Sequence, residues 1–228
     1  MTTLCECWTD DIWRLIHVFA RTSSLKDNEE KAAFCTLLLS LNQIISCPIV
    51  EKEIVFFMEQ TDNNIMNYLS SNDRLFSWTY YLRQHVNKLF SKTLPSLEEF
   101  SVQYSPTSLT KDNWGPIIWK GFHFIMLAAK EESGFCSIDV SMALKAFVTC
   151  LAILLPCPFC RKHAWEYYTS HSIDDWLDTS LHAFEWSVLF HNNVNQITNQ
   201  TGTKRMYTPQ EALVLYDPHR SNLRWKTI

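Results

Sequence analysis

An all-α fold is predicted for this chain of 228 residues, and three features of the sequence predict it. Glycine is scarce, at four residues, whereas turn-rich β proteins use it often. Long apolar segments recur, and they are bounded by polar residues, prolines or glycines, as helices are. Hydrophobic residues make up 46% of the chain and charged residues 19%, so a sizeable core can be buried.

Two halves are predicted, joined by a linker. Residues 94–113 contain two prolines and many small polar side chains, a composition typical of a linker. Residues 1–93 and 114–228 are each long enough to form a domain.

Residues 114–228 predict four helices and a short fifth. The expected ranges are 114–132, 139–155, 157–170, 173–200 and a short helix that starts at 208. Asp112 or Asn113 caps the first helix, and Gly134 follows its end. The second helix stops before Pro156, and the third has Pro158 in its first turn, where proline is tolerated.

The first half repeats this layout in a weaker form, which predicts an internal duplication. Three landmarks recur in the same order: Trp8, Trp13 and His17 correspond to Trp114, Trp119 and His123; residues 46–50 correspond to 156–160; Phe76, Trp78, Val86 and Asn87 correspond to Phe184, Trp186, Val194 and Asn195. In the first copy, Val50 replaces the second cysteine, and Arg83 stands where His191 stands. Chance recurrence among Trp-rich helices is the alternative.

The segment Cys157-Pro-Phe-Cys160 is the sharpest chemical feature of the sequence. Two thiols three residues apart can close a disulfide and reopen it. A helix N-terminus offers unpaired N–H groups and a partial positive charge, which stabilise a thiolate, and the basic residues 161–163 act in the same direction. Because a thiolate is the species that attacks disulfides, the motif suits redox chemistry.

A lone C-x-x-C also occurs in zinc sites and in thioredoxin-like folds. Zinc normally needs four ligands, and no second C-x-x-C or H-x-x-x-H completes a set here, so no metal site is expected. The thioredoxin motif follows a β-strand in a βαβ unit. The apolar run 146–155 could serve as that strand, but it continues the helical pattern before it, and later strands are not apparent.

Charge and hydropathy exclude several classes of partner. A net charge of -4 and a pI near 6.0 predict no nucleic-acid partner and no anionic membrane surface. The longest apolar run has ten residues, whereas a membrane span needs about 20. The first residues lack the basic and apolar regions of a signal peptide, so we expect no signal peptide.

Eight cysteines in such a chain favour catalytic or metal-binding thiols over a secreted disulfide scaffold.

Taken alone, the Trp and His residues are typical of core aromatics, but their order around C-x-x-C resembles the Erv/ALR family of FAD-dependent sulfhydryl oxidases. The family pattern is W-G-x-x-x-W-x-x-x-H, then C-x-x-C, then W followed by H-N-x-V-N. This sequence supplies it as Trp114, Gly115, Trp119 and His123, then Cys157 and Cys160, then Trp186, His191, Asn192, Val194 and Asn195. The resemblance covers about residues 111–217.

The resemblance implies a four-helix bundle with a short fifth helix that cradles FAD. It implies that Cys157, the more accessible sulfur, exchanges with the thiols of substrate proteins, while Cys160 lies beside the flavin. Electrons then pass to FAD and on to molecular oxygen, giving hydrogen peroxide. The residues implied to line the FAD site are Trp114, Trp119, His123, Trp186, His191, Asn192 and Asn195, with His163 as a weaker candidate.

The sequence departs from the family pattern in two places. Gln200 stands about where the family has a lysine, and Lys204 or Arg205 is the expected substitute for contacting the phosphates of FAD. The structural disulfide that usually follows C-x-x-C is absent. Cys5 and Cys7 are the close-spaced candidates for the shuttle dithiol of many family members, and a structural or idle pair is the alternative. The other cysteines are expected to be buried in apolar helices: Cys35, Cys47, Cys136 and Cys150.

A degenerate copy before a catalytic one resembles the sulfhydryl oxidases of baculoviruses and related large insect DNA viruses. Family members commonly pair two such domains, so the first half is expected to be a built-in partner, a pseudo-dimer; a homodimer in addition is left open. The resemblance implies the host nucleus or cytoplasm and the virion as locations. The competing functions are a flavin-free helical scaffold and a thioredoxin-like exchange protein, and bound yellow FAD separates the oxidase from both.

Overall fold

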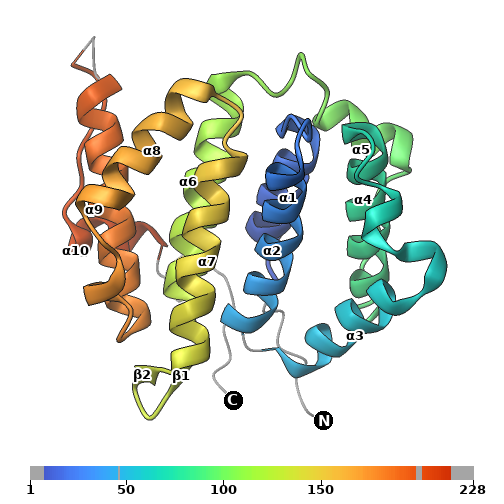
Figure 1. Cartoon of the computed structure of the whole chain (residues 1–228), viewed down its shortest axis with the longest axis horizontal. Coiled ribbons are helices and arrows are strands. Elements are labelled where there is room, and N and C mark those ends of the chain that lie inside the picture. The colour runs from blue at the N-terminus through green and yellow to red at the C-terminus, as the bar shows by residue number, and fades with distance from the viewer. Residues whose placement is uncertain (1–7, 46, 199–201, 217–228) are drawn as a thin grey trace.

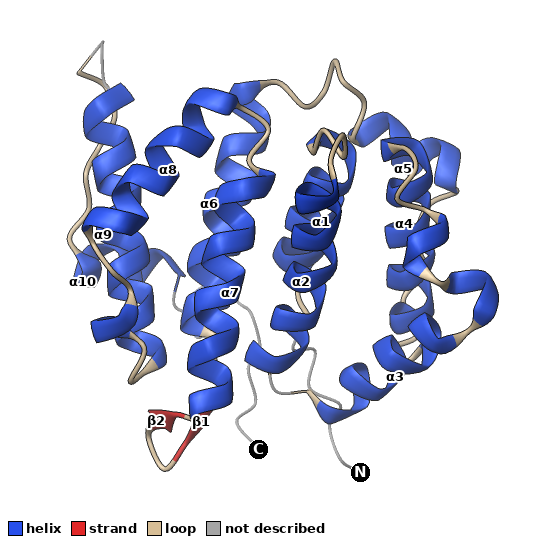
Figure 2. Ribbon diagram, viewed as in Figure 1, coloured by secondary structure: helices blue, strands red, loops and turns tan. Residues whose placement is uncertain are grey.

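The computed structural model describes residues 8–45, 47–198 and 202–216, and it confirms the all-α prediction. The helices of the first half are α1 Asp10–Thr22, α2 Asn28–Ile44, α3 Pro48–Glu59, α4 Asn72–Lys88 and α5 Leu97–Gln103. Those of the second half are α6 Lys111–Leu127, α7 Ile138–Leu154, α8 Pro158–Ser170, α9 Ser180–Thr198 and α10 Pro209–Tyr216. Short 3-10 turns lie at Thr61–Asn63, Ile65–Asn67 and Asp174–Trp176. Within the described ranges, Figure 2 shows a single hairpin, in which β1 Glu131–Glu132 pairs antiparallel with β2 Phe135–Cys136.

Side-chain caps explain where several helices begin. The side chain of Asp27 accepts a hydrogen bond from the Glu30 backbone N–H at 2.8 Å, at the start of α2. Ser137 does the same for α7, and Ser96 opens α5 with a reciprocal capping box. Such caps satisfy the first-turn N–H groups, which have no partner inside the helix.

Two helices of the second half have boundaries that differ from the sequence prediction. α6 begins at Lys111 rather than at 114, because Thr110 takes the extended conformation of an N-cap, and it ends at Leu127 rather than at 132. The hairpin follows instead, since Ser133 and Gly134 at its tip both have positive φ, which no α-helix accommodates. α9 begins at Ser180 rather than at 173, because a 3-10 turn comes first.

Residues 94–113 are more than a linker, because α5 lies within them. Phe100 and Tyr104 are only 3% and 5% exposed, and the Phe100 ring centroid lies 4.9 Å from that of His17 in the first half. The two prolines that suggested a linker flank the helix rather than interrupt it. The segment therefore completes the core of the first half.

The two halves lie side by side, and their central helices pack across the boundary (Figure 1). α1 packs against α6, and α2 packs against α7. Within the halves, α1 also packs against α4, and α6 packs against α9. α1 and α6 carry the first pair of repeated sequence landmarks, and α2 and α7 each precede the second pair. Buried side chains from both halves form one continuous core.

The helices α1 and α6 approach closely at Gly121. A Cβ atom there would lie 2.8 Å from Leu15 Cδ1 and 3.2 Å from the Asp11 carbonyl oxygen, so residue 121 must be small. Lys120 Nζ lies 3.1 Å from Asp11 Oδ2 across the same boundary. Among the described residues, no helix is both long enough and apolar enough to cross a membrane.

Candidate active site

The dithiol sits at the start of α8, as the sequence predicted. Cys157 is the N-cap, its sulfur accepts a hydrogen bond from the Cys160 backbone N–H at 3.2 Å, and Pro158 occupies the first turn. Both cysteines are half-buried and carry free thiols. The cap fixes the first sulfur over the N-terminus of the helix, where positive partial charge favours a thiolate.

The two thiols differ in acidity. Burial raises the pKa of Cys157, but the hydrogen bonds from Cys160 and the charge of Lys111 outweigh burial and leave that pKa below its ordinary value. Burial raises the pKa of Cys160 to about 12, and the hydrogen bond to Cys157 and the negative charge on that sulfur add to the rise. Cys157 is therefore the more acidic thiol of the pair, and Cys160 is the one that keeps its proton more firmly.

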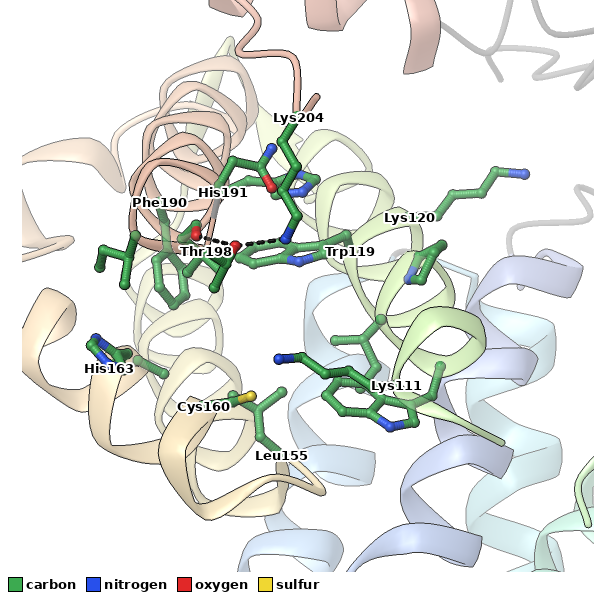
Figure 3. A pocket seen from close by; sticks show the side chains of 18 of the residues that line it. Lys111, Trp119, Lys120, Leu155, Cys160, His163, Phe190, His191, Thr198 and Lys204 are labelled. Carbon is green, nitrogen blue, oxygen red and sulfur yellow. Dashed lines mark hydrogen bonds between the residues drawn. The ribbon is translucent and has the colours of Figure 1, made fainter. Parts of the chain in front are cut away.

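A cavity of about 840 Å³ opens beside Cys160, between α6, α8, α9 and the segment before α10. Cys160 lines it, whereas Cys157 does not. Figure 3 shows the Cys160 sulfur on one side of this space, with Trp119 and Lys111 across from it and His163 on the same helix. A cavity of this size is within the range of sites that hold large organic ligands.

Aromatic rings form one wall of the cavity. Trp119 and His191 stack with centroids 4.0 Å apart and planes 7° apart. Phe190 meets Trp119 edge to face at 5.3 Å. Both Trp119 and His191 come from helices that pack against each other, α6 and α9, so the stack is held by the bundle itself. Such a flat surface suits the planar rings of a ligand.

A chain of hydrogen bonds fixes the protons of the two histidines in this wall. The Ser187 hydroxyl donates to the Phe184 carbonyl oxygen at 2.6 Å, so it accepts from His123 Nδ1–H at 2.8 Å. Burial, then the charge of His191, lowers the pKa of His123 well below its usual value, so its Nε2 is an acceptor. His191 Nδ1–H donates to that atom at 3.0 Å.

His191 is therefore neutral and carries its free lone pair on Nε2. Burial, then the charge of Lys204, lowers the pKa of His191 to about 4. Its ring lines the cavity, so the chain of bonds that starts at Ser187 presents a hydrogen-bond acceptor in that wall.

Two asparagines of α9 hold the segment that closes the cavity. Asn192 donates to the Tyr207 carbonyl oxygen at 2.7 Å and accepts from the Tyr207 backbone N–H at 3.1 Å. Asn195 donates to the Arg205 carbonyl oxygen at 3.3 Å. This pairing keeps Lys204 and Arg205 at the rim, where Lys204 Nζ also donates to Thr198 Oγ1 at 2.6 Å.

The structure brings together some of the residues that the sequence singled out. Those that line the cavity are Trp114, Trp119, Cys160, His163, His191, Asn195 and Lys204. Trp186 and His123 are 1% exposed and lie behind this lining, where Trp186 Nε1 donates to the His171 carbonyl oxygen at 3.0 Å. Asn192 does not line the cavity and instead binds Tyr207.

Other lining residues were missed by the motif argument: Lys111, Lys120, Phe190, Thr198, Tyr207 and Tyr216. Helical spacing could have found two of them, because Lys111 precedes Trp114 by one turn and Thr198 follows Asn195 by one turn. Tyr207 and Tyr216 reach the cavity only through folding of the last segment.

The remaining cysteines lie apart from the dithiol. Cys47 and Cys150 are buried, Cys35 is half-buried, and Cys136 lies in strand β2 rather than in a helix, which corrects the prediction for that residue. The hairpin is responsible, because it replaces the expected end of the first helix. Cys5, Cys7 and Gln200 lie outside the described residues. Among the residues that are described, no cluster of three His, Cys, Asp or Glu side chains could hold a metal ion.

Relatives with named functions match part of the chain. Residues 116–211 match the Erv1/Alr family. The FAD-linked sulfhydryl oxidase of African swine fever virus (isolate Tick/Malawi/Lil 20-1/1983) is 29% identical over 89 residues, which cover 39% of this chain and 70% of that protein. Protein 096R of Invertebrate iridescent virus 3, whose name proposes the same activity, is 25% identical over 87 residues, 38% of this chain and 57% of that protein. No solved structure matches the chain. The match to the Erv1/Alr family thus spans residues 116–211, which contain the dithiol, the aromatic stack and most of the residues that line the cavity.

Proposed function

We propose that this chain is an FAD-dependent thiol oxidase that forms disulfide bonds in substrate proteins. The proposal rests on the difference between the two thiols of the dithiol in position and in acidity. Cys160 lines the cavity, whereas Cys157 lies outside the lining and has the lowered pKa. One sulfur is thus available to substrate thiols and the other to a group in the cavity.

The residues of the cavity fit FAD. The stacked Trp119 and His191 offer a flat wall for a ring system, and Lys111, Lys120, Lys204 and Arg205 line the same space with positive charge that suits a pyrophosphate. When bound, FAD would supply an acceptor for the two electrons removed from two thiols, and molecular oxygen would take them up with two protons as hydrogen peroxide.

The residues of the chain perform the exchange with substrate. In the oxidised protein, a substrate thiolate attacks Cys157, the Cys157–Cys160 bond breaks, and a mixed disulfide forms. A second substrate thiol releases Cys157 as a thiolate, which the Cys160 N–H stabilises at the helix start. Cys160 takes up the proton, in keeping with its raised pKa of about 12.

The domain organisation is part of the proposal. We infer that residues 114–228 form the catalytic domain and that residues 1–93 are a degenerate copy, which makes the chain a pseudo-dimer. Support comes from the packing of α1 on α6 and of α2 on α7, because equivalent elements meet at a two-fold interface. A further homodimer, the baculovirus-type subgroup and a location in the host nucleus, cytoplasm or virion remain predictions from the resemblance.

The direct test is colour together with oxygen uptake. We would purify the full chain, record its visible spectrum, and add dithiothreitol while following oxygen. A flavin band near about 450 nm and oxygen uptake with peroxide formation are expected. A folded but colourless protein that consumes no oxygen even after FAD is added would rule the oxidase out.

A further inference from the structure

One residue of the first half reaches the dithiol helix of the second half. Glu30, on α2, is 3% exposed, and its Oε1 lies 2.5 Å from Arg161 Nη1. Arg161 directly follows Cys160 in the sequence and lies in the first turn of α8. The side chain of Arg161 is 28% exposed, so the pair is shielded from most of the solvent.

Arg161 also holds the turn that leads into the dithiol. Its Nε–H donates to the Leu155 carbonyl oxygen at 2.6 Å, and its backbone N–H donates to the Cys157 carbonyl oxygen at 3.0 Å. Leu155 lines the cavity beside Cys160. The guanidinium therefore bridges Leu155, the first residue after α7, and the carboxylate of Glu30 in the first half, while the backbone of Arg161 belongs to the dithiol helix.

Glu30 is itself held in place by the first half. Its Oε2 accepts hydrogen bonds from the Ser24 hydroxyl and from the Lys26 backbone N–H, the latter at 3.2 Å. Burial raises the pKa of Glu30, but these bonds and the partner Arg161 outweigh burial and leave the pKa below its ordinary value. The carboxylate is thus ionised, and the loop 24–26 fixes its direction.

We propose that Glu30 and Arg161 are positioning residues for the dithiol, through which the first half sets the reduction potential of the Cys157–Cys160 pair. This inference rests on the proposed function, because it assumes that the pair cycles between dithiol and disulfide. The anchored guanidinium holds residues 155–157 against the start of α8, which keeps the Cys157 sulfur over the Cys160 N–H. This arrangement stabilises the reduced pair, and a stabilised reduced form makes a dithiol a better oxidant when it is a disulfide.

A redox titration of the full chain in dithiothreitol buffers tests this. Three variants are compared: Glu30→Gln, Arg161→Lys and the double variant Glu30→Met/Arg161→Met. Arg161→Lys keeps the positive charge but loses the planar guanidinium with its several donors. The double variant leaves no unpaired buried charge. Each variant should make the Cys157–Cys160 disulfide harder to reduce. The equilibrium constant for its reduction by dithiothreitol should fall about tenfold, which corresponds to a reduction potential lower by about 30 mV for two electrons. Alkylation of Cys157 by iodoacetamide at neutral pH should slow in the same variants.

The control is Asp174→Asn, which removes the ion pair between Asp174 and Lys145 Nζ, 2.6 Å long and about half exposed. It should leave the potential unchanged. Folded Arg161→Lys and Glu30→Met/Arg161→Met variants with the wild-type potential and alkylation rate would overturn the positioning role. A wild-type pair that forms no disulfide in any buffer would instead overturn the proposed function, so the two failures are distinguishable.

Discussion

The two halves of the molecule share a framework of hydrogen bonds. His17 Nδ1 bonds to Thr79 Oγ1 at 2.9 Å in the first half, and His123 Nδ1 bonds to Ser187 Oγ at 2.8 Å in the second. The two indole groups agree as well, since Trp78 Nε1 donates to the Asn63 carbonyl oxygen at 2.7 Å, and Trp186 makes the corresponding bond. These groups are buried in both halves, so they maintain the fold whether or not a cavity lies in front of them.

The halves differ at the residue next to this buried histidine, which is His191 in the second half and Arg83 in the first. In the second half, His191 completes the chain of bonds and stacks on Trp119. In the first half, Arg83 takes that position and bonds to Asp10 at 2.5 Å, and His17 Nε2 finds no hydrogen-bond partner within the described residues. The rings of Phe100 and Tyr104 lie 4.9 and 5.4 Å from His17. The first half thus keeps the buried framework, while aromatic side chains fill the space around it.

The largest contrast is expected between Cys160 and Cys47. Cys160→Ala should reduce thiol oxidation to the background rate, because the sulfur that lines the cavity is lost. Cys47→Ala, in the first copy of the motif where Val50 replaces the second thiol, should keep activity. Oxygen uptake with dithiothreitol measures both, and an active Cys160→Ala protein would contradict the assignment of the dithiol.

Acid should destabilise the second half through His191. Its pKa is about 4 in the folded protein, against about 6.5 in an unfolded chain, so the unfolded state takes up the proton first. Stability is therefore present above about pH 6.5 and lost as the pH falls toward 4, by at most about 3 kcal/mol. Urea unfolding at pH 7 and pH 5 measures it. His191→Gln should reduce the dependence without removing it, because burial also lowers the pKa of His123 and of His17. An unchanged slope in the variant would assign the whole dependence to other groups.

The contact between the halves should respond to added volume at Gly121. Gly121→Ala should lower the free energy of unfolding by about 2 kcal/mol, because the new Cβ overlaps Leu15 on α1. Leu15→Ala removes Cδ1 but keeps the Leu15 Cβ atom, 2.9 Å from the new one, so it relieves only part of the overlap. The double variant should therefore lose somewhat less than the sum of the two single changes. Thermal and urea unfolding provide the comparison. Strictly additive changes in the free energy of unfolding would show that residues 15 and 121 do not interact.

Flavin retention should separate His191 from Arg83. His191→Ala removes one ring of the stack and should weaken FAD binding by about tenfold. Arg83→Ala, at the equivalent position of the first half, should leave FAD binding unchanged and lower stability alone. Equilibrium dialysis with FAD gives both constants. Equal losses of affinity would mean that the first half also contributes to the cofactor site.

The smallest expected effect concerns Lys111. This lysine lines the cavity beside Cys160, and its charge lowers the pKa of both thiols. Lys111→Met should raise the pKa of Cys157 and slow its alkylation at neutral pH by a factor of about two to five. Lys162→Met, on the exposed side of α8, is the matched control. A faster reaction in Lys111→Met would reverse the sign of the inferred interaction.

Local signals were sufficient for much of the fold. Prolines, caps and apolar spacing predicted the helices around the dithiol, and Pro158 and Cys157 stand at the helix start that the sequence indicated. The hairpin at 131–136 and the helix within 94–113 were missed, because each depends on packing that its own composition does not specify. Phe100, for example, becomes a core residue only through its contact with His17.

The candidate site was predictable in chemistry but not in arrangement. An all-α chain, a dithiol at a helix N-terminus and a set order of Trp and His residues could all be predicted, because these features depend on neighbours a few positions away. Helix packing, in contrast, placed His123 and Trp186 behind the cavity and Lys111 in its lining. It also decided that Glu30 meets Arg161, which is 131 residues away. Contacts over such separations arise when helices pack, and no local pattern encodes which side chains will then be neighbours.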